Sequence, residues 1–268
     1  MLDLLSRIKK QKPLVHHITN WVTIYDCANI TRAIGALPVM AHAEEEVEEM
    51  ASIASAVVLN IGTLTTNLVK SMILAAKKAN EKGIPVVLDA VGVGATTLRT
   101  RKAEEILDSV KVSVLKGNAS EIATLAGVEA ETKGVEAMSV KGNPVEIARR
   151  LAKEKDLTVV ITGKEDVISN SKKTYICKNG HPMLGSFVGT GCMVASVLGA
   201  FCAVEKDYSF ASSLALCCFG IAGEIAATPV SSVKGPGSYK IRFFDEMSSI
   251  GSYSIERIAG MVKLEKLI

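Results

Sequence analysis

The stretch AVVLNIGTLTTNLVKSMILAAKKANEKGIPVVLDA, residues Ala56–Ala90, contains a complete strand–helix–strand pattern. Its two ends, 56–62 and 84–90, are apolar almost throughout, which is typical of strands buried on both faces of a sheet. The segment 65–83 between them has apolar residues at helical spacing and ends in a lysine and a glycine, a suitable C-terminal cap. This order predicts a βαβ unit and therefore a parallel sheet.

The same alternation continues along the chain. Apolar runs typical of buried strands recur at 111–117 and 158–163. Between them, 143–156 has a helical pattern, with Asn143 as its N-cap and Pro144 at its first helical position. These segments predict further βαβ units of the same sheet.

Two β-rich runs, 166–170 and 173–178, are joined by polar residues and predict a hairpin at the sheet edge. The sequence contains no linker, low-complexity run or internal repeat. We therefore expect one α/β domain over residues 1–268, in which a mostly parallel central sheet lies between two layers of helices (α/β/α).

Composition argues against several classes of protein. Hydrophobic residues make up 48% and charged residues 22% of the chain, which is typical of a soluble protein with a large core. The net charge is +3, and no basic stripe with interleaved aromatic residues points to nucleic acid. We expect the two apolar C-terminal runs, 193–204 and 210–230, to be buried helices rather than membrane spans. Without a targeting signal or a CxxC pair among the six cysteines, we expect a cytoplasmic protein with reduced thiols.

Polar residues lie at the ends of the expected strands: Asp89, Lys116, Asn118, Glu121 and Thr162. In an open α/β sheet, ligands bind beyond the carboxyl ends of the strands. Carboxylates suit hydrated Mg²⁺, and a lysine suits phosphate. Each of these residue types is common in loops after strands, but together they favour a site for Mg²⁺ and a polyphosphate.

The stretch GSFVGTGCMVAS, residues 185–196, places two glycines and a cysteine directly before an apolar helical run. Gly189 and Gly191 let the backbone approach a ligand without a Cβ in the way. Backbone N–H groups at a helix N-terminus favour an anion. The stretch matches neither the Walker sequence nor GxGxxG, and a glycine-rich turn before a helix is common, so this motif by itself is a weak signal.

Several motifs resemble, in the same order, those of the hydroxyethylthiazole kinases of the ribokinase-like superfamily: PLVHHITNWVTIYDCAN, GALPVMAHAEEE, LNIGTL, VVLDAVGVGAT, KGNASEI, VITGKEDVI, GTGCM and GPGSYKIRFFDEM. The resemblance runs from about Pro13 to near the C-terminus. It implies transfer of the γ-phosphoryl group of ATP to the primary alcohol of 4-methyl-5-(2-hydroxyethyl)thiazole, in thiamine salvage. It also implies a homotrimer with active sites between subunits.

On the substrate side, the resemblance assigns three residues. Met40 matches the family's thiazole-contacting methionine, and Gly189 matches a substrate-side glycine of the anion hole. Asn20 lies in the N-terminal motif that lines the thiazole pocket.

On the nucleotide side, Lys116 matches a position where the family usually has an arginine that contacts ATP, and Thr162 matches an ATP-contacting threonine. Asp89 and Glu121 match the acidic residues near Mg²⁺.

Two departures from the family's pattern stand out. Lys116 offers a point charge rather than a planar fork, which loosens nucleotide contacts. Ala90 stands where proline is usual, which leaves that turn less rigid.

At the position of Cys192 the wider superfamily usually has an aspartate, the base that takes the alcohol proton. A cysteine stands there in this chain, as it does in some thiazole kinases. We therefore expect Cys192 to be the catalytic base. A free thiol has a pKa of about 8.5, which a helix N-terminus lowers and bound ATP raises again. General base catalysis contributes roughly 10²–10⁴-fold, so a poor base gives a slow enzyme rather than a dead one. The alternative is that Cys192 is a small packing residue.

Two other functions stay open at this point. One is a different ribokinase-like kinase that acts on another small alcohol. The other is a nucleotide-binding regulator without turnover. The regulator is disfavoured by Asp89, Asn118 and Glu121, because a protein that only binds a nucleotide does not need the metal-binding acids.

Overall fold

A nine-stranded sheet runs through the computed structural model, in the order β11-β10-β9-β8-β5-β4-β3-β1-β2. The structure describes residues 1–133, 136–229 and 233–267. The strands of this sheet are β1 (Leu14–Ile18), β2 (Leu37–Val39), β3 (Ala56–Asn60), β4 (Val86–Asp89), β5 (Val114–Asn118), β8 (Thr158–Thr162), β9 (Asp166–Ser169), β10 (Thr174–Cys177) and β11 (Leu264–Lys266). A separate antiparallel pair consists of β6 (Ala130–Lys133) and β7 (Glu136–Val140).

The strands from β8 to β2 are all parallel, as the sequence predicts. Strands β9, β10 and β11 continue the sheet in antiparallel order. The predicted hairpin is therefore confirmed as β9 and β10, but its position at the edge is wrong. The short strand β11 pairs with β10 on its outer side, and so covers the edge that β10 would otherwise expose.

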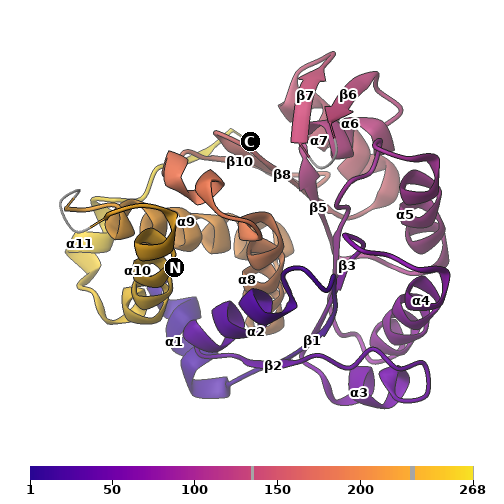
Figure 1. The fold of residues 1–268 in the computed structure, drawn as a ribbon, viewed down its shortest axis with the longest axis horizontal. Helices are drawn as coiled ribbons and strands as arrows, with labels where there is room; N and C mark the ends of the chain where they lie inside the picture. Colours follow the sequence, from indigo (N-terminus) through magenta and orange to yellow (C-terminus); the bar gives the residue numbers. More distant parts are fainter. Residues whose placement is uncertain (134–135, 230–232, 268) are drawn as a thin grey trace.

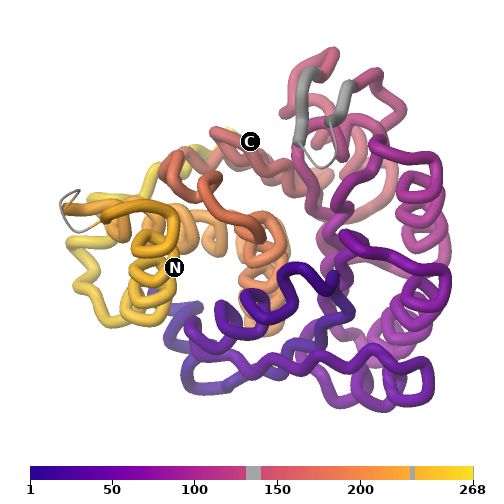
Figure 2. Tube along the Cα trace, in the orientation of Figure 1, coloured from indigo at the N-terminus to yellow at the C-terminus, as the bar shows by residue number. Residues whose placement is uncertain are grey.

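Helices cover both faces of the sheet (Figure 1). One face carries α1 (Leu2–Gln11), α2 (Ile24–Ala33), α8 (Thr190–Val204), α9 (Tyr208–Ala226) and α10 (Pro236–Ser249), with the short η1 (Pro182–Ser186), η3 (Ile250–Ser252) and α11 (Ile255–Ala259). The other face carries α3 (Val47–Ile53), α4 (Thr66–Glu81), α5 (Thr97–Ser109), α6 (Ala119–Leu125) and α7 (Pro144–Lys155). Both ends of the chain contribute helices to the first layer (Figure 2).

Alternate residues of each strand point into the two hydrophobic clusters. In β3, Val58 packs in the cluster beneath α8, whereas Val57 and Leu59 pack in the cluster beneath α4. All three side chains are at most 1% exposed. Because a strand presents successive side chains to opposite faces, an apolar strand of this kind requires cover on both sides. The α/β/α fold class is confirmed.

The helix caps that the sequence predicts are also present in the structure. The Thr65 hydroxyl caps α4 by accepting from the backbone N–H of Leu68, and Gly83 follows the helix at φ 66°. The Asn143 side chain accepts from the backbone N–H of Val145, with Pro144 at the first position of α7. Caps of this type replace hydrogen bonds that the first turn of a helix lacks.

Within the described residues, α9 is the one helix long and apolar enough to cross a membrane. The structure buries 83% of that segment inside the protein, as part of the cluster on the face of α8. The expectation that the apolar C-terminal runs are buried helices is confirmed.

Helix α8 lies very close to the sheet because residue 199 is glycine. A Cβ at Gly199 would lie 2.6 Å from Cγ2 of Val58 and 3.1 Å from Cγ1 of Val15. Both neighbours belong to buried parallel strands. The N-terminus of α8 therefore reaches the sheet edge in a position that this contact fixes.

We predict that Gly199→Ala lowers the free energy of unfolding by about 1–2 kcal/mol, because overpacking of about 1–3 kcal/mol exceeds the gain from replacing a helical glycine. The matched control is Gly237→Ala in α10, where nothing lies within 4 Å of the new Cβ. Urea unfolding measures both variants. Equal stability of Gly199→Ala and wild type would show that α8 can lift off the sheet without cost.

Candidate active site

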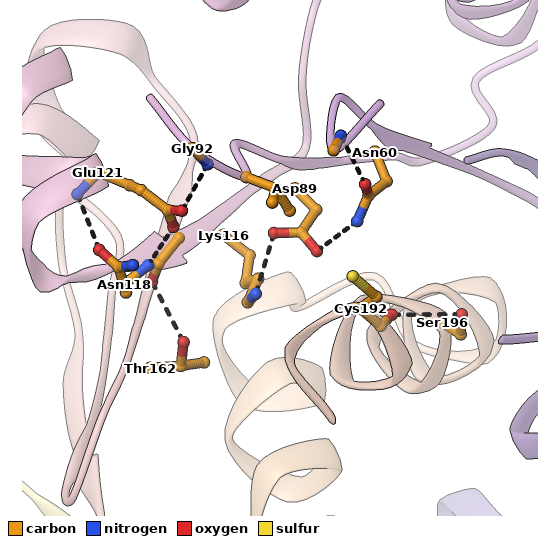
Figure 3. Close-up of polar contacts among 12 residues, drawn as sticks. Asn60, Asp89, Gly92, Lys116, Asn118, Glu121, Thr162, Cys192 and Ser196 are labelled. Carbon is orange, nitrogen blue, oxygen red and sulfur yellow. Dashed lines mark hydrogen bonds and ion pairs between the residues drawn. The ribbon is translucent and has the colours of Figure 1, made fainter. Parts of the chain in front are cut away.

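Polar side chains from four strands and one helix lie along the carboxyl edge of the sheet (Figure 3). Asn60 ends β3, Asp89 ends β4 and Thr162 ends β8. Lys116 lies near the end of β5, and Cys192 lies in the first turn of α8. Parallel strands end at the same edge, so the predicted gathering of strand-end residues follows from the topology.

A buried ion pair lies at the centre of this group. Nζ of Lys116 donates to Oδ1 of Asp89 at 2.9 Å, and Nδ2 of Asn60 donates to Oδ2 at 2.8 Å. The two charged side chains are 5% and 0% exposed. Burial raises the pKa of Asp89. Burial lowers the pKa of Lys116, but the carboxylates of Asp89 and Glu121 outweigh it and raise that pKa, so the lysine keeps its proton.

The two glycines of the GTG motif each make a close approach possible. Gly189 is the N-cap of α8 at φ 104°, and a Cβ there would lie 2.8 Å from Cγ2 of Thr23. A Cβ at Gly191 would lie 3.1 Å from Nζ of Lys116. The ammonium group therefore lies against the first turn of α8, whose free N–H groups carry partial positive charge. Two positive groups at one place favour an anion between or beside them.

Glu121 anchors the local backbone with both of its oxygens. Oε1 accepts from the backbone N–H of Gly92 at 2.7 Å, and Oε2 accepts from that of Asn118 at 2.6 Å. Oδ1 of Asn118 accepts from the N–H of Glu121 at 2.9 Å, which completes a capping box at the start of α6. Burial raises the pKa of Glu121 to about 7, against the opposing charge of Lys116.

The fit of Asp89 and Glu121 to Mg²⁺ can be judged from their surroundings. Among the side chains that the structure describes, no three His, Cys, Asp or Glu residues gather to hold a metal ion. All four carboxylate oxygens of this pair already accept hydrogen bonds. Each retains lone pairs, and Mg²⁺ is usually held by one or two carboxylates together with water and substrate phosphates. These residues fit that mode of binding and do not fit a cage built from protein ligands alone.

Cys192 is half-buried, and its Sγ accepts a hydrogen bond from Nδ2 of Asn20 at 3.3 Å. Burial raises the pKa of its thiol, and the charge of Asp89 adds to that effect more than Lys116 offsets it. The net shift of this pKa is therefore upward, opposite in direction to the effect expected of the helix N-terminus alone. The thiol is neutral at neutral pH and is a weak base.

Asn20 links the thiol to the ion pair. Its Nδ2 donates to Oδ1 of Asn60 at 2.9 Å and to Oγ1 of Thr23 at 2.9 Å. Asn60 in turn donates to Asp89. Neutral amides thus form a continuous path of hydrogen bonds from Cys192 to Asp89, and through it to Lys116.

Met40 lies apart from this path. It follows β2, which is separated from β3 by β1, and its carbonyl accepts from Nδ1 of His42 at 3.0 Å. The ring centroid of His42 lies 4.8 Å from that of Trp21, next to Asn20 in the chain. Through His42, Met40 is thus connected to the loop between β1 and α2 (residues 19–23, the N-terminal loop). It is not connected to Cys192 directly.

Thr162 borders a separate cavity of about 350 Å³. Its Oγ1 donates to the carbonyl of Gly117 at 3.4 Å. The cavity continues past the end of β8 toward the start of α7, with Pro144, Val145 and Ile161 among its lining residues. Its lining combines apolar and polar side chains, a composition that suits a flat heterocycle.

Sequence reasoning missed Asn60, although the signal was present. It ends the strand at 56–60 just as Asp89 ends the next one, and the rule that selected Asp89 applies to it equally. Asp166 was also missed. Burial raises its pKa to about 7, and one of its oxygens accepts from the N–H of Gly163 at 3.0 Å.

We predict that the contribution of Glu121 to the free energy of unfolding falls as pH rises from about 4.5 to about 7. Its folded-state pKa is raised from 4.5, so the folded protein binds the proton more tightly and loses that advantage once the carboxyl ionises. The shift corresponds to about 3 kcal/mol. The free energy of unfolding, measured by urea across this range, should depend less on pH in Glu121→Gln than in wild type.

Asp166→Asn serves as the comparison, because Asp166 titrates in the same range. The two substitutions should each remove part of the pH dependence. Identical pH profiles for Glu121→Gln and wild type would contradict a buried, proton-binding Glu121.

Comparisons with known proteins point to one family over nearly the whole chain. A sequence profile of the hydroxyethylthiazole kinase family matches residues 5–252. A protein of Methanosarcina mazei named hydroxyethylthiazole kinase is 57% identical over 267 residues, with 100% of both chains covered. The solved structure of a hydroxyethylthiazole kinase from Pyrococcus horikoshii is similar at a TM-score of 0.88 and 40% identity, covering 100% of this chain and 98% of that one.

A ribokinase-like superfamily protein of Enterococcus faecalis shares the fold at a TM-score of 0.65 and 13% identity, covering 94% of each chain. At that identity the likeness concerns the fold alone.

Proposed function

We propose, since this chain belongs to the hydroxyethylthiazole kinase family, that it transfers the γ-phosphoryl group of ATP to the primary alcohol of 4-methyl-5-(2-hydroxyethyl)thiazole, a step of thiamine salvage. In this proposal residues 1–268 act as one kinase domain. The observation that carries it is the Lys116 ammonium, held by Asp89 against the first turn of α8.

Phosphoryl transfer passes through a loose transition state that mainly requires positioning and stabilisation of charge. Lys116 and the N–H groups after Gly189 supply positive charge on the same side of the sheet edge. Both are fixed before a substrate arrives, the lysine by an ion pair and the helix by its packing on β3. Thr162 and its cavity lie two strands from β4, where the remainder of a nucleotide would extend.

Asp89 and Glu121 are the residues that would hold Mg²⁺, through water and the phosphates of ATP. The ion would neutralise phosphate charge there. Glu121 would need to release its proton, since a protonated carboxyl is a poor ligand for a cation, and its pKa of about 7 allows this at neutral pH.

Cys192 takes the place of a catalytic base in this proposal. Its raised pKa keeps the thiol neutral, so its sulfur contributes by accepting a hydrogen bond from the substrate alcohol, and only the small fraction present as thiolate can take the proton. Asn20 already donates to this sulfur and fixes its direction.

Asn20, Gly189 and Met40 form the substrate side. A second cavity of about 410 Å³ is lined by Trp21 and His42, and His42 connects it to Met40 through the hydrogen bond to the Met40 carbonyl. The rings of Trp21 and His42 suit contact with the apolar thiazole.

Exposed apolar side chains surround the substrate side. Trp21, Val22 and Tyr25 in the N-terminal loop and α2 are 56%, 69% and 77% exposed, and Val188 beside Gly189 is 70% exposed. Gly189 contacts Thr23, so these side chains form one region. Large exposed apolar groups gathered at one place mark interaction surfaces. This supports self-association through the substrate side, and the family resemblance supplies the number of three subunits with sites between them.

We predict that light scattering gives about three times the mass of the chain, because a heterologous contact closes into a ring. Tyr25→Lys, which places a charge in this region, should shift the assembly toward smaller species and lower turnover together. A wild-type monomer with full turnover would rule out shared sites.

We predict ADP release that depends on both Mg²⁺ and hydroxyethylthiazole, measured in a coupled assay. A panel of other small alcohols, pyridoxal among them, tests the alternative that this is another ribokinase-like kinase. Faster turnover of a different alcohol would replace the substrate assignment. Nucleotide binding without turnover of any alcohol would instead support a regulator.

We predict that Cys192→Ala is slower than wild type and that Cys192→Asp is equal or faster. Aspartate is a stronger acceptor with an ordinary pKa near 3.9, although the neighbouring Asp89 opposes its charge. The measurement is kcat at one pH for wild type and for the Asp, Ser and Ala variants. If Ala matches wild type, Cys192 is a packing residue, and if Asp is inactive while Ala survives, the pocket depends on the smaller thiol.

A further inference from the structure

Arg99, near the start of α5, binds three backbone carbonyls in two different loops. Its Nη1 donates to the carbonyls of Ile61 and Val91, both at 3.0 Å, and its Nη2 donates to that of Gly62 at 2.7 Å. The first and third lie in the loop after β3, and the second lies in the loop after β4. A single guanidinium therefore ties the two loops at the carboxyl edge to each other.

The loop after β4 carries the metal side of the site. Directly after Val91, the backbone N–H of Gly92 donates to Oε1 of Glu121 at 2.7 Å. A shift of the loop at Val91 would move this donor and release one oxygen of the carboxylate. The position of Glu121 thus depends on where Arg99 holds its neighbouring turn.

The loop after β3 connects to the substrate side. The backbone N–H of Gly62 donates to Oδ1 of Asn60 at 2.9 Å, and the same oxygen accepts from Asn20. One residue further, Oγ1 of Thr63 accepts from the backbone N–H of Trp21 at 3.1 Å. The N-terminal loop therefore rests on the segment whose carbonyls Arg99 binds.

The site is built around this side chain. Gly92 has φ 77°, and a Cβ there would lie 3.0 Å from both Cδ and Nη1 of Arg99. Glycine is required for the backbone and for the guanidinium to occupy this space. The planar fork of an arginine can serve several acceptors at fixed angles, whereas a lysine at residue 99 would offer one flexible point charge.

We propose that Arg99 is a positioning residue that holds the metal-side and substrate-side loops in one arrangement, so that the acceptor alcohol and the phosphates are aligned. The kinetic part of this proposal rests on the proposed kinase function. A misplacement of about 1 Å in such a site lowers the rate by about 100-fold.

The test compares Arg99→Lys and Arg99→Met with Arg101→Met, an exposed arginine on the same helix. Gly92→Ala is a second route to the same defect, because its Cβ displaces the guanidinium. We expect the Arg99 and Gly92 variants to lower kcat/KM for hydroxyethylthiazole by about 10- to 100-fold and the Arg101 variant to match wild type. Urea unfolding of each variant gives the folded fraction to which the rates are normalised.

A readout independent of activity comes from Trp21, the single tryptophan of the chain. Its ring lies against His42, and the backbone N–H of Trp21 donates to Oγ1 of Thr63. Because this ring is already 56% exposed, release of the loop after β3 should mainly increase its mobility, so the anisotropy of the emission should fall in the unliganded Arg99→Met and Gly92→Ala proteins. Arg101→Met should leave the anisotropy unchanged.

The two readouts distinguish the positioning role of Arg99 from the proposed kinase function. Wild-type kcat/KM per folded molecule together with wild-type anisotropy in the Arg99 variants would overturn the positioning role and leave a purely structural one. Absence of turnover in the wild-type protein would overturn the proposed function, and the emission anisotropy of Trp21 would still decide whether Arg99 holds the loops.

Discussion

The buried ion pair between Asp89 and Lys116 is the constraint on which the rest of the site depends. The two residues are direct partners in the pairing of β4 with β5, so the sheet itself places them side by side. Removing one member of such a pair leaves an unpaired buried charge and costs about 3–5 kcal/mol. An apolar pair would be at least as stable, so the charges are better explained by the ligand than by the fold. Lys116 lies tightly against the first turn of α8, where a Cβ at Gly191 would be 3.1 Å from its Nζ.

Neutral amides extend this arrangement to the substrate side. Asn60 and Asn20 connect Asp89 to the thiol of Cys192 without adding charge. Positive charge is thereby concentrated at Lys116 and the start of α8, and the alcohol side stays nearly neutral. A weakly basic thiol suits a reaction in which positioning and charge stabilisation contribute more than proton removal.

The sequence was most informative where the same type of residue recurs along a strand or helix. Fully apolar runs predicted the parallel strands, and their last residues predicted Asp89, Lys116 and Thr162 at one edge. Strand β11 is three residues long and carries no such pattern, so the covered edge was not foreseen. The raised pKa of Cys192 arises from tertiary burial, which its position at a helix start does not reveal. Contacts of Arg99 with backbone carbonyls depend on loop positions rather than on residue types.

The most direct test of the account is the affinity of a non-hydrolysable ATP analogue with Mg²⁺, measured by calorimetry for wild type, Lys116→Gln and Lys111→Gln. Lys111 is an exposed lysine shortly before β5, and its side chain is 74% exposed. A hydrogen bond to a charged group contributes about 1.5–3 kcal/mol, so we expect a loss of affinity of roughly 10- to 100-fold for Lys116→Gln. We expect no loss for Lys111→Gln. Equal affinity of Lys116→Gln and wild type, in a protein that remains folded, would contradict a phosphate site organised by the buried ion pair.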